Sequence, residues 1–199
     1  MSTGYRNDNT LNLLTPGMKL NDRYEIIEQR GQGAFGTLYK AVDHGLDEPR
    51  DVAVKQIHRM VANDKRAMRR IKREVAIARN LGHPNIVRVY ELETWRDFTY
   101  IVMHYINGLN LSDYLADQKD EKLPLEVVLN CLKDISAGLD YLHDQKPPII
   151  HRDLKPSNLI REEKTGNIII TDFGLAREAK NSISQQSMMD TSGSPPYMA

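Results

Sequence analysis

Cysteine is nearly absent from this sequence of 199 residues, which contains only Cys131. One thiol cannot form a disulfide within the chain, so the sequence is not that of a small disulfide-stabilised secreted domain. Because Cys131 lies in an apolar, periodic stretch, we interpret it as a buried structural residue. A reducing compartment, and hence a cytoplasmic location, is the prediction.

Long hydrophobic runs and an excess of one charge are also missing. No stretch approaches the roughly 20 apolar residues of a membrane span, and residues 1–19 lack the basic leader and apolar region of a signal peptide. Lys plus Arg equals Asp plus Glu, at 27 each, so no net field draws the chain to nucleic acid or to an anionic membrane. We expect no nucleic-acid partner and no membrane segment, although an anchor after Ala199 stays compatible with the sequence.

Sequence patterns divide the chain into a polar extension and two parts of different character. Short β-prone runs bounded by Gly, Asp or Pro come first and are interrupted by one helical pattern over about 64–81. Helical patterns then dominate, the longest of them over 124–145. We therefore expect an α+β fold with two lobes. The expected boundaries are 1–21 for a flexible extension, 22–105 for the strand-rich lobe, 104–110 for a hinge and 111–199 for the helix-led lobe.

Residues 31–36 read GQGAFG, a glycine pattern found in two unrelated phosphate-binding loops. In a dinucleotide-binding turn, a helix follows the last glycine and an acidic residue lies about 20 residues on, as Asp51 does here. Here the run TLYKAV follows instead, and its alternation and β-prone residues predict a strand. The sequence thus disfavours a nicotinamide-dependent oxidoreductase. It favours a hairpin whose backbone approaches phosphates at Gly31, Gly33 and Gly36.

A lysine and a glutamate follow on a predicted strand and a predicted helix. Lys55 ends the run VAVK, and Glu74 lies at the edge of an apolar helix stripe, where a carboxylate needs a cationic partner. We predict that the two side chains form an ion pair, which leaves the ammonium directed at phosphate oxygens. Taken singly, each residue has an ordinary surface position as its alternative.

Two further motifs are HRDLKPSN at 151–158 and TDFG at 171–174. Together with GQGAFG and VAVK, they occur in the order and spacing of the eukaryotic-type protein kinase catalytic domain, which the sequence resembles from about Tyr24 to Ala199. The forms LKPSN and TSGSPPYMA resemble the serine/threonine branch, and PPIIHRD resembles bacterial members. The resemblance implies a protein-kinase-like fold with a β-rich N-lobe and a helical C-lobe.

The same resemblance implies ATP-dependent phosphoryl transfer to Ser or Thr hydroxyls of a protein substrate, with Mg²⁺ as cofactor. It makes Asp153 the catalytic base, directs Lys155 to the γ-phosphate and gives Asn158 a catalytic, metal-binding role. Asp172 is the other metal ligand that it implies. The nucleotide-binding residues that it implies are Gly31, Gly33, Gly36, Lys55 and Glu74, with Met103, His104 and Ile106 at the hinge.

The resemblance stops inside a motif, because YMA at the end of the sequence precedes Pro-Glu in the family. We therefore expect a fragment of a longer protein, with an incomplete C-lobe and a helix 124–145 that lacks part of its burial partner. A nucleotide-binding or regulatory module without turnover is the alternative function. The apolar face expected for that helix consists of Val128, Leu132, Ile135, Leu139 and Leu142.

Two local patterns carry separate hypotheses. Asp190 lies three residues before Gly193, where many relatives carry a phosphorylatable Thr, so we hypothesise that its carboxylate partly replaces that phosphate near Arg152. The run KRAMRRIKR (65–73) is basic, but no aromatic residues interleave with it. We interpret it as the solvated face of the helix that carries Glu74, and not as a nucleic-acid site.

Overall fold

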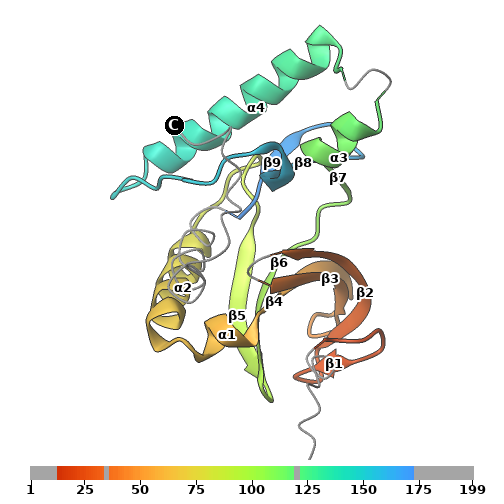
Figure 1. Ribbon diagram of the computed structural model, residues 1–199, viewed down its shortest axis with the longest axis vertical. Helices are drawn as coiled ribbons and strands as arrows, with labels where there is room; N and C mark the ends of the chain where they lie inside the picture. Colours follow the sequence, from red (N-terminus) through yellow and green to blue (C-terminus); the bar gives the residue numbers. More distant parts are fainter. Residues whose placement is uncertain (1–12, 34–35, 119–121, 173–199) are drawn as a thin grey trace, which may run out of the picture.

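The computed structural model describes residues 13–33, 36–118 and 122–172, which form two lobes (Figure 1). The first lobe is a curled sheet with two helices, and the second is a long helix packed on a small sheet. In chain order, the first lobe contains β1 (Lys19–Leu20), β2 (Tyr24–Gly33), β3 (Gly36–Asp43), β4 (Arg50–Ile57), α1 (Arg59–Asn63), α2 (Lys65–Ala78), β5 (Val89–Trp95) and β6 (Phe98–His104). The second contains β7 (Gly108–Asn110), α3 (Leu111–Ala116), α4 (Leu125–His143), the 3₁₀ turn η2 (Pro156–Asn158), β8 (Leu159–Glu162) and β9 (Ile168–Ile170).

The sheet of the first lobe has six strands in the order β1-β2-β3-β4-β6-β5, and all neighbouring pairs are antiparallel. Its strands alternate between two apolar faces, as their sequences predict. One face buries Tyr24, Tyr39 and Tyr100 in a cluster of its own, and the other packs against α2. Apolar residues therefore pack against both faces of the β3–β4 pair. This packing fixes the position of the two strands and, with it, the direction of the side chains near their ends.

Residues 13–20 are not a flexible extension, so that prediction was wrong for them. Leu14 and Leu20 are buried in the tyrosine-rich cluster, and the backbone N–H of Leu14 donates to the Tyr39 hydroxyl at 3.2 Å. Apolar residues inside a polar stretch thus close the open face of the sheet. Residues 1–12 lie outside the part of the chain that the structure describes.

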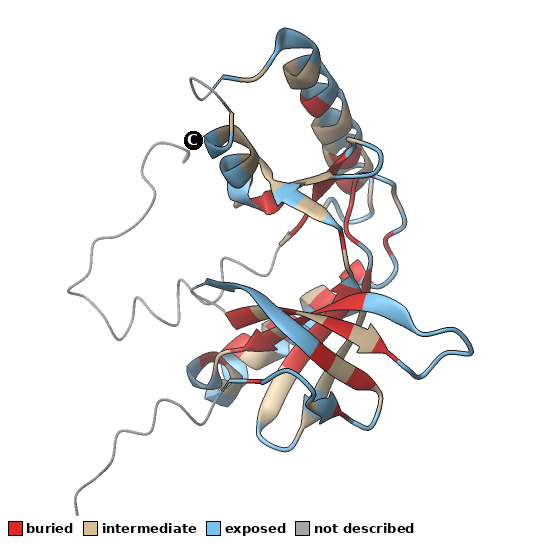
Figure 2. Cartoon of the chain, turned by 90° about the vertical axis from the view of Figure 1, so that its right-hand side faces the viewer, coloured by how far each residue is buried: buried red, intermediate tan, exposed pale blue. Residues whose placement is uncertain are grey.

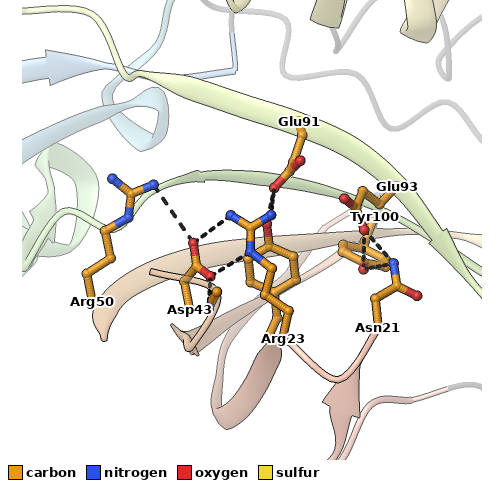
Figure 3. Close-up of polar contacts among 9 residues, drawn as sticks. Asn21, Arg23, Asp43, Arg50, Glu91, Glu93 and Tyr100 are labelled. Carbon is orange, nitrogen blue, oxygen red and sulfur yellow. Dashed lines mark hydrogen bonds and ion pairs between the residues drawn. The ribbon is translucent and has the colours of Figure 1, made fainter. Parts of the chain in front are cut away.

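A polar network joins the outer strands of the first lobe (Figure 3). Asp43 is only 1% exposed and accepts hydrogen bonds from Arg23 Nε at 2.7 Å and Arg23 Nη2 at 2.9 Å. Arg23 Nη1 also lies 2.9 Å from Glu91 Oε1. Nearby, Asn21 Nδ2 donates to the Tyr100 hydroxyl at 3.0 Å. The network links the β1–β2 turn to β3, β5 and β6, so it stabilises the arrangement of these strands.

Helix α2 begins directly after a capping residue, Asp64. The Asp64 carboxylate accepts hydrogen bonds from the backbone N–H groups of Arg66 at 2.7 Å and Ala67 at 3.2 Å, which satisfies two N–H groups of the first turn. The helix buries Ala67, Ile71, Val75 and Ala78 against the sheet. The basic residues that it leaves exposed, as predicted for a solvated face, are Lys65, Arg66, Arg69, Lys72 and Arg73.

Helix α4 occupies most of the predicted range 124–145, and its predicted apolar face is confirmed in part. Leu142 is buried, and Ile135 and Leu139 pack against the core, whereas Leu132 is 55% exposed. A Cβ at Gly138, which is also buried, would lie 2.8 Å from Ile170 Cδ1, so the helix contacts β9 closely at this glycine. Figure 2 shows that the far side of α4 is exposed. No described helix is long and apolar enough to cross a membrane.

A short extended segment joins α2 to the second lobe. Ile86 forms a parallel bridge with Ile170 of β9, and the N–H of Val87 donates to Ile170 O at 3.0 Å. Asn85 Nδ2 donates to Ile168 O at 2.8 Å. These contacts pair Ile86 and Val87 with β9, and β5 begins after them, at Val89. They also hold β9, and the loop after it, beside the first lobe.

Candidate active site

The loop from His151 to Asn158 is fixed to the chain that follows β9. His151 is buried, and its Nε2 lies 2.9 Å from the Thr171 carbonyl oxygen. Burial lowers the pKa of His151 by desolvation, so the ring is neutral and donates one N–H to that carbonyl. The Thr171 N–H in turn donates to Asn158 O at 2.9 Å. These bonds set the loop beside Asp172.

Three of the predicted catalytic residues lie together in this loop. Lys155 Nζ is 3.0 Å from Asp153 Oδ2. The Asn158 amide, held by the turn η2, donates through Nδ2 to Asp153 O at 2.7 Å and to Asp153 Oδ2 at 3.2 Å. The Lys155 ammonium and the Asn158 amide therefore orient the Asp153 carboxylate. A group that must present one oxygen in a fixed direction needs such supporting contacts.

Asp172 reaches across to the first lobe. Its Oδ1 lies 2.5 Å from Lys55 Nζ on β4. The backbone of Asp172 has φ 57° and that of Arg152 has φ 66°, a region that residues with a Cβ occupy at a cost of order 1–3 kcal/mol. The strain falls on the two loops that carry Asp153 and Asp172, which is where strained backbone concentrates in functional sites.

The predicted ion pair between Lys55 and Glu74 is absent, so this prediction was wrong for the structure. Glu74 Oε2 is buried without a hydrogen-bond partner. Desolvation raises the pKa of Glu74 to about 7, against the opposing charges of Arg152 and Arg70. The side chain lines a small cavity of about 10 Å³ with Met103 and Asp172. The physical reason is that the Glu74 and Asp172 carboxylates compete for the single ammonium of Lys55. Lys55 contacts the more accessible carboxylate, that of Asp172.

The predicted glycine hairpin is present as the β2–β3 pair, although residues 34–35 lie outside the described chain. Its glycines differ in their surroundings. A Cβ at Gly36 would lie 1.9 Å from Gln56 O, so this glycine permits close approach of β3 to β4. A Cβ at Gly31 or Gly33 would meet nothing within 4 Å, which leaves their side of the hairpin open to a ligand.

The predicted hinge residues differ in burial. Met103 is buried and lines the same cavity as Glu74. The N–H of His104 donates to Arg88 O at 2.8 Å. Ile106 is 8% exposed, and its N–H has no hydrogen-bond partner among the residues that the structure describes. The Ile106 N–H is therefore a backbone donor of this segment that no described residue occupies.

Asn85 is the residue of this region that sequence patterns did not indicate. The predicted helical pattern ends at about residue 81, just before the sequence GHPN (82–85), and no pattern gave Asn85 a role, yet its side chain and carbonyl both bind β9. The signal was an asparagine between a proline and an apolar run, which is also the composition of an ordinary turn. Asp190 and its proposed role near Arg152 lie outside the described residues.

Residues 24–199 match the family described as protein kinase domain. The chain is 38% identical over 160 residues to serine/threonine-protein kinase PrkC of Bacillus subtilis, covering 80% of this chain and 24% of PrkC. It is 41% identical over 170 residues to serine/threonine-protein kinase tousled-like 2 of Homo sapiens, covering 79% of this chain and 21% of that protein. The chain thus spans about a quarter of the length of PrkC and about a fifth of the length of tousled-like 2.

Solved structures agree. The Mycobacterium tuberculosis PknI kinase domain superposes with a TM-score of 0.71 at 28% identity, covering 83% of this chain and 63% of that one. The structure described as PpkA-294 apo form, with a TM-score of 0.75 at 22% identity over 88% of this chain and 67% of its own, shares the fold. The α+β, two-lobed fold that the motifs implied is therefore confirmed, and the chain belongs to the protein kinase domain family.

Proposed function

We propose that this chain transfers the γ-phosphoryl group of ATP to Ser or Thr hydroxyls of a protein substrate. The observation that carries the proposal is the meeting of Asp153, Lys155, Asn158, Lys55 and Asp172 where the two lobes adjoin. Phosphoryl transfer requires mainly positioning and neutralisation of charge. Two ammonium groups, two carboxylates and an amide in one place supply both.

Asp153 is the proposed base. Its carboxylate accepts hydrogen bonds from Asn158 and lies beside Lys155, so one oxygen can receive the proton of a substrate hydroxyl as that hydroxyl attacks phosphorus. The ammonium of Lys155 stands next to the same carboxylate and would contact the transferred phosphoryl group. General-base contributions of this kind amount to about 10²–10⁴ in rate.

Asn158 and Asp172 would hold Mg²⁺. Both hydrogens of the Asn158 amide are directed at Asp153, which leaves Oδ1 to ligate a cation, and Asp172 adds a hard carboxylate oxygen. No group of three or more His, Cys, Asp or Glu in the described chain forms a metal site of its own, which fits a metal held partly by nucleotide oxygens and water. Bound Mg²⁺ supplies charge neutralisation at the β- and γ-phosphates.

The nucleotide would lie between the glycine hairpin and the hinge. Gly31 and Gly33 leave the hairpin open on one side, and the Ile106 N–H is available to an adenine ring. Lys55 would contact the α- and β-phosphates, which requires that it leave Asp172. Glu74 is then the carboxylate able to hold its ammonium. We also infer a cytoplasmic location from the single cysteine and the neutral composition.

The test is incorporation of labelled phosphate from ATP and Mg²⁺ into a generic basic protein by the 199-residue chain. We expect Asp153→Asn and Asp172→Asn to lower the rate at least about 10²-fold. Asp140→Asn, which removes an exposed carboxylate on α4, is the matched control and should keep it. Incorporation that survives both of the first substitutions would sink the proposal.

A nucleotide-binding module without turnover is the second candidate. It is favoured by the contact between Lys55 and Asp172 and by the unpaired Glu74, because neither arrangement leaves the ammonium on phosphate. A thermal shift with ATP, lost in Lys55→Met, together with no incorporation by the parent chain would select this candidate. Incorporation by the parent chain would exclude it.

A further inference from the structure

A series of buried hydrogen bonds joins the segment before β1 to strand β4. The backbone N–H of Leu14 donates to the Tyr39 hydroxyl at 3.2 Å, and this hydroxyl donates to Gln56 Oε1 at 3.2 Å. All three residues are buried, and Tyr39 is only 1% exposed. A hydroxyl on β3 therefore ties the entering chain to β4 inside the first lobe.

The Tyr39 hydroxyl is not needed for packing. The ring lies in the tyrosine-rich cluster together with Val52 and Val54, where a phenylalanine ring would fill nearly the same volume. A buried hydroxyl is costly unless it is hydrogen-bonded. Because this hydroxyl both accepts from one partner and donates to another, we interpret its contribution as fixing where those partners lie.

Gln56 occupies a position on β4 next to the candidate site. It directly follows Lys55, and adjacent side chains of a strand point to opposite faces of the sheet. Gln56 thus reaches the cluster, while Lys55 Nζ lies 2.5 Å from Asp172 Oδ1. The Gln56 carbonyl oxygen is also the atom that a Cβ at Gly36 would meet at 1.9 Å. The position of Gln56 is therefore coupled to Lys55 and to the last glycine of the hairpin.

The segment before β1 has backbone contacts that do not depend on Tyr39. The N–H of Gly17 donates to Ile26 O at 2.8 Å, and the N–H of Ile26 donates to Met18 O at 2.9 Å. These bonds pair the segment with β2. Loss of the Tyr39 hydroxyl should therefore leave the segment on the sheet, and its effect should fall on Gln56 and β4.

We propose that Tyr39 is a positioning residue for nucleotide binding, which through Gln56 holds β4 so that the Lys55 ammonium meets the α- and β-phosphates of ATP. The inference rests on the proposed function, in which Lys55 contacts these phosphates. Tyr39 acts from the opposite face of the sheet and is not itself a nucleotide contact. Its loss should lower the affinity for ATP more than the rate at saturating ATP, because the proposed base Asp153 lies on the other lobe.

The test compares two tyrosines of the same cluster by isothermal titration of ATP and Mg²⁺ into the 199-residue chain. Tyr100 is the matched control (Figure 3), because its buried hydroxyl accepts from Asn21 Nδ2 at 3.0 Å and donates to Glu93 Oε2 at 3.1 Å. Neither of these partners lies on β4. Both Tyr39→Phe and Tyr100→Phe should melt at a lower temperature than the parent chain, since each loses buried hydrogen bonds. Only Tyr39→Phe should bind ATP about fivefold more weakly, with Tyr100→Phe within about twofold of the parent.

A second variant removes the same hydrogen bond from its other end and replaces Tyr39→Phe if that variant does not fold. Gln56→Met lacks the acceptor but keeps the length of the side chain, so it should weaken ATP binding about as much as Tyr39→Phe does. The double variant Tyr39→Phe, Gln56→Met should bind within about twofold of the weaker single variant, because both substitutions remove the same bond.

Three results would overturn the inference and leave the proposed function standing. They are unchanged ATP affinity in Tyr39→Phe or Gln56→Met, equal losses of affinity in Tyr39→Phe and Tyr100→Phe, and additive losses in the double variant. A parent chain that binds no ATP at about 1 mM would overturn the proposed function and this inference together. Phosphate incorporation at saturating ATP should stay within about twofold of the parent rate in Tyr39→Phe. A larger fall of that rate at unchanged KM would assign Tyr39 a role other than holding Lys55 and overturn the inference as well.

Discussion

Lys55 Nζ lies 2.5 Å from Asp172 Oδ1, and this contact joins β4 of the first lobe to the loop after β9 of the second. The two charges neutralise each other where a nucleotide would need both separately. Glu74, which the sequence assigned to Lys55, is left with a buried, unpaired oxygen. The structure therefore shows the site's charges paired with each other, and the proposed nucleotide would have to separate them.

The unpaired Glu74 predicts a pH-dependent stability. Because the pKa of Glu74 is raised from 4.5 to about 7, the folded chain holds a proton that the unfolded chain loses as pH rises between these values. The free energy of unfolding should therefore fall across this window by this contribution. Glu74→Gln cannot ionise, so its melting temperature relative to the parent should rise from pH 4.5 to 7. A constant difference across that range would contradict the burial of an unpaired carboxyl.

Lys55→Met should weaken ATP binding at least about tenfold, because an ammonium facing phosphates in a partly buried site contributes more than a surface charge. Isothermal titration in the presence of Mg²⁺ measures the change. Lys133→Met, which alters an exposed lysine of α4, is the control and should bind ATP as the parent does. Unchanged ATP affinity in Lys55→Met would remove this lysine from the site.

Gly36→Ala should destabilise the first lobe. The new Cβ would lie 1.9 Å from Gln56 O, so β3 and β4 must move apart, at a cost of about 1–3 kcal/mol. Urea unfolding measures the loss. Gly31→Ala is the matched variant, since a Cβ there meets nothing within 4 Å, and it should leave stability within about 0.5 kcal/mol. Equal losses in the two variants would contradict the close approach of β3 and β4.

Asp43→Asn should cost about 2–3 kcal/mol of unfolding free energy, less than a fully buried pair because Arg23 is partly exposed. Desolvation raises the pKa of Asp43, but hydrogen bonds from Arg23 and the Gly45 N–H outweigh it, so the net pKa is lowered. The stabilisation is therefore present at neutral pH and lost as pH falls below 3.8, the ordinary value. Urea unfolding at pH 7 and pH 3 checks both statements.

The control for that prediction is Glu28→Gln, which alters an exposed pair with Arg30. It should change the unfolding free energy by less than about 0.5 kcal/mol at either pH. A loss as large as that of Asp43→Asn would show that net charge, and not the buried network, determines the effect.

Sequence reasoning found the longer strands and the two longer helices from local patterns, whereas the resemblance to protein kinases indicated the residues of the loop 151–158. Alternation predicted β3 and β4, and Asp153, Lys155 and Asn158 are so near in sequence that one loop brings them together. Local signals suffice where the partners are near in sequence.

The failures concern partners distant in sequence. Lys55 had two carboxylates within reach, and the choice of Asp172 over Glu74 depends on their relative exposure, which no local pattern encodes. In the sequence, Leu14 and Leu20 are isolated apolar residues within a polar stretch. In the folded chain they are buried in the tyrosine-rich cluster on one face of the sheet. The face of α4 was predicted only in part, because Gly138 counts as neutral in a hydrophobic pattern, yet the helix contacts β9 closely there.

The hydrogen bonds of residues 85–87 to β9 make one end of α2 a fixed point. If α2 rotates as a rigid body about this end, residues near Ala78 move least and residues near Lys65 move most. Lys65 lies about 20 Å from Ala78 along the axis and Glu74 about 6 Å, at 1.5 Å per residue. A rotation that carries Glu74 through one ångström therefore carries Lys65 through about three. The displacement is largest at Lys65, so a rearrangement around Lys55 should be detected most easily by a probe placed at that end of α2.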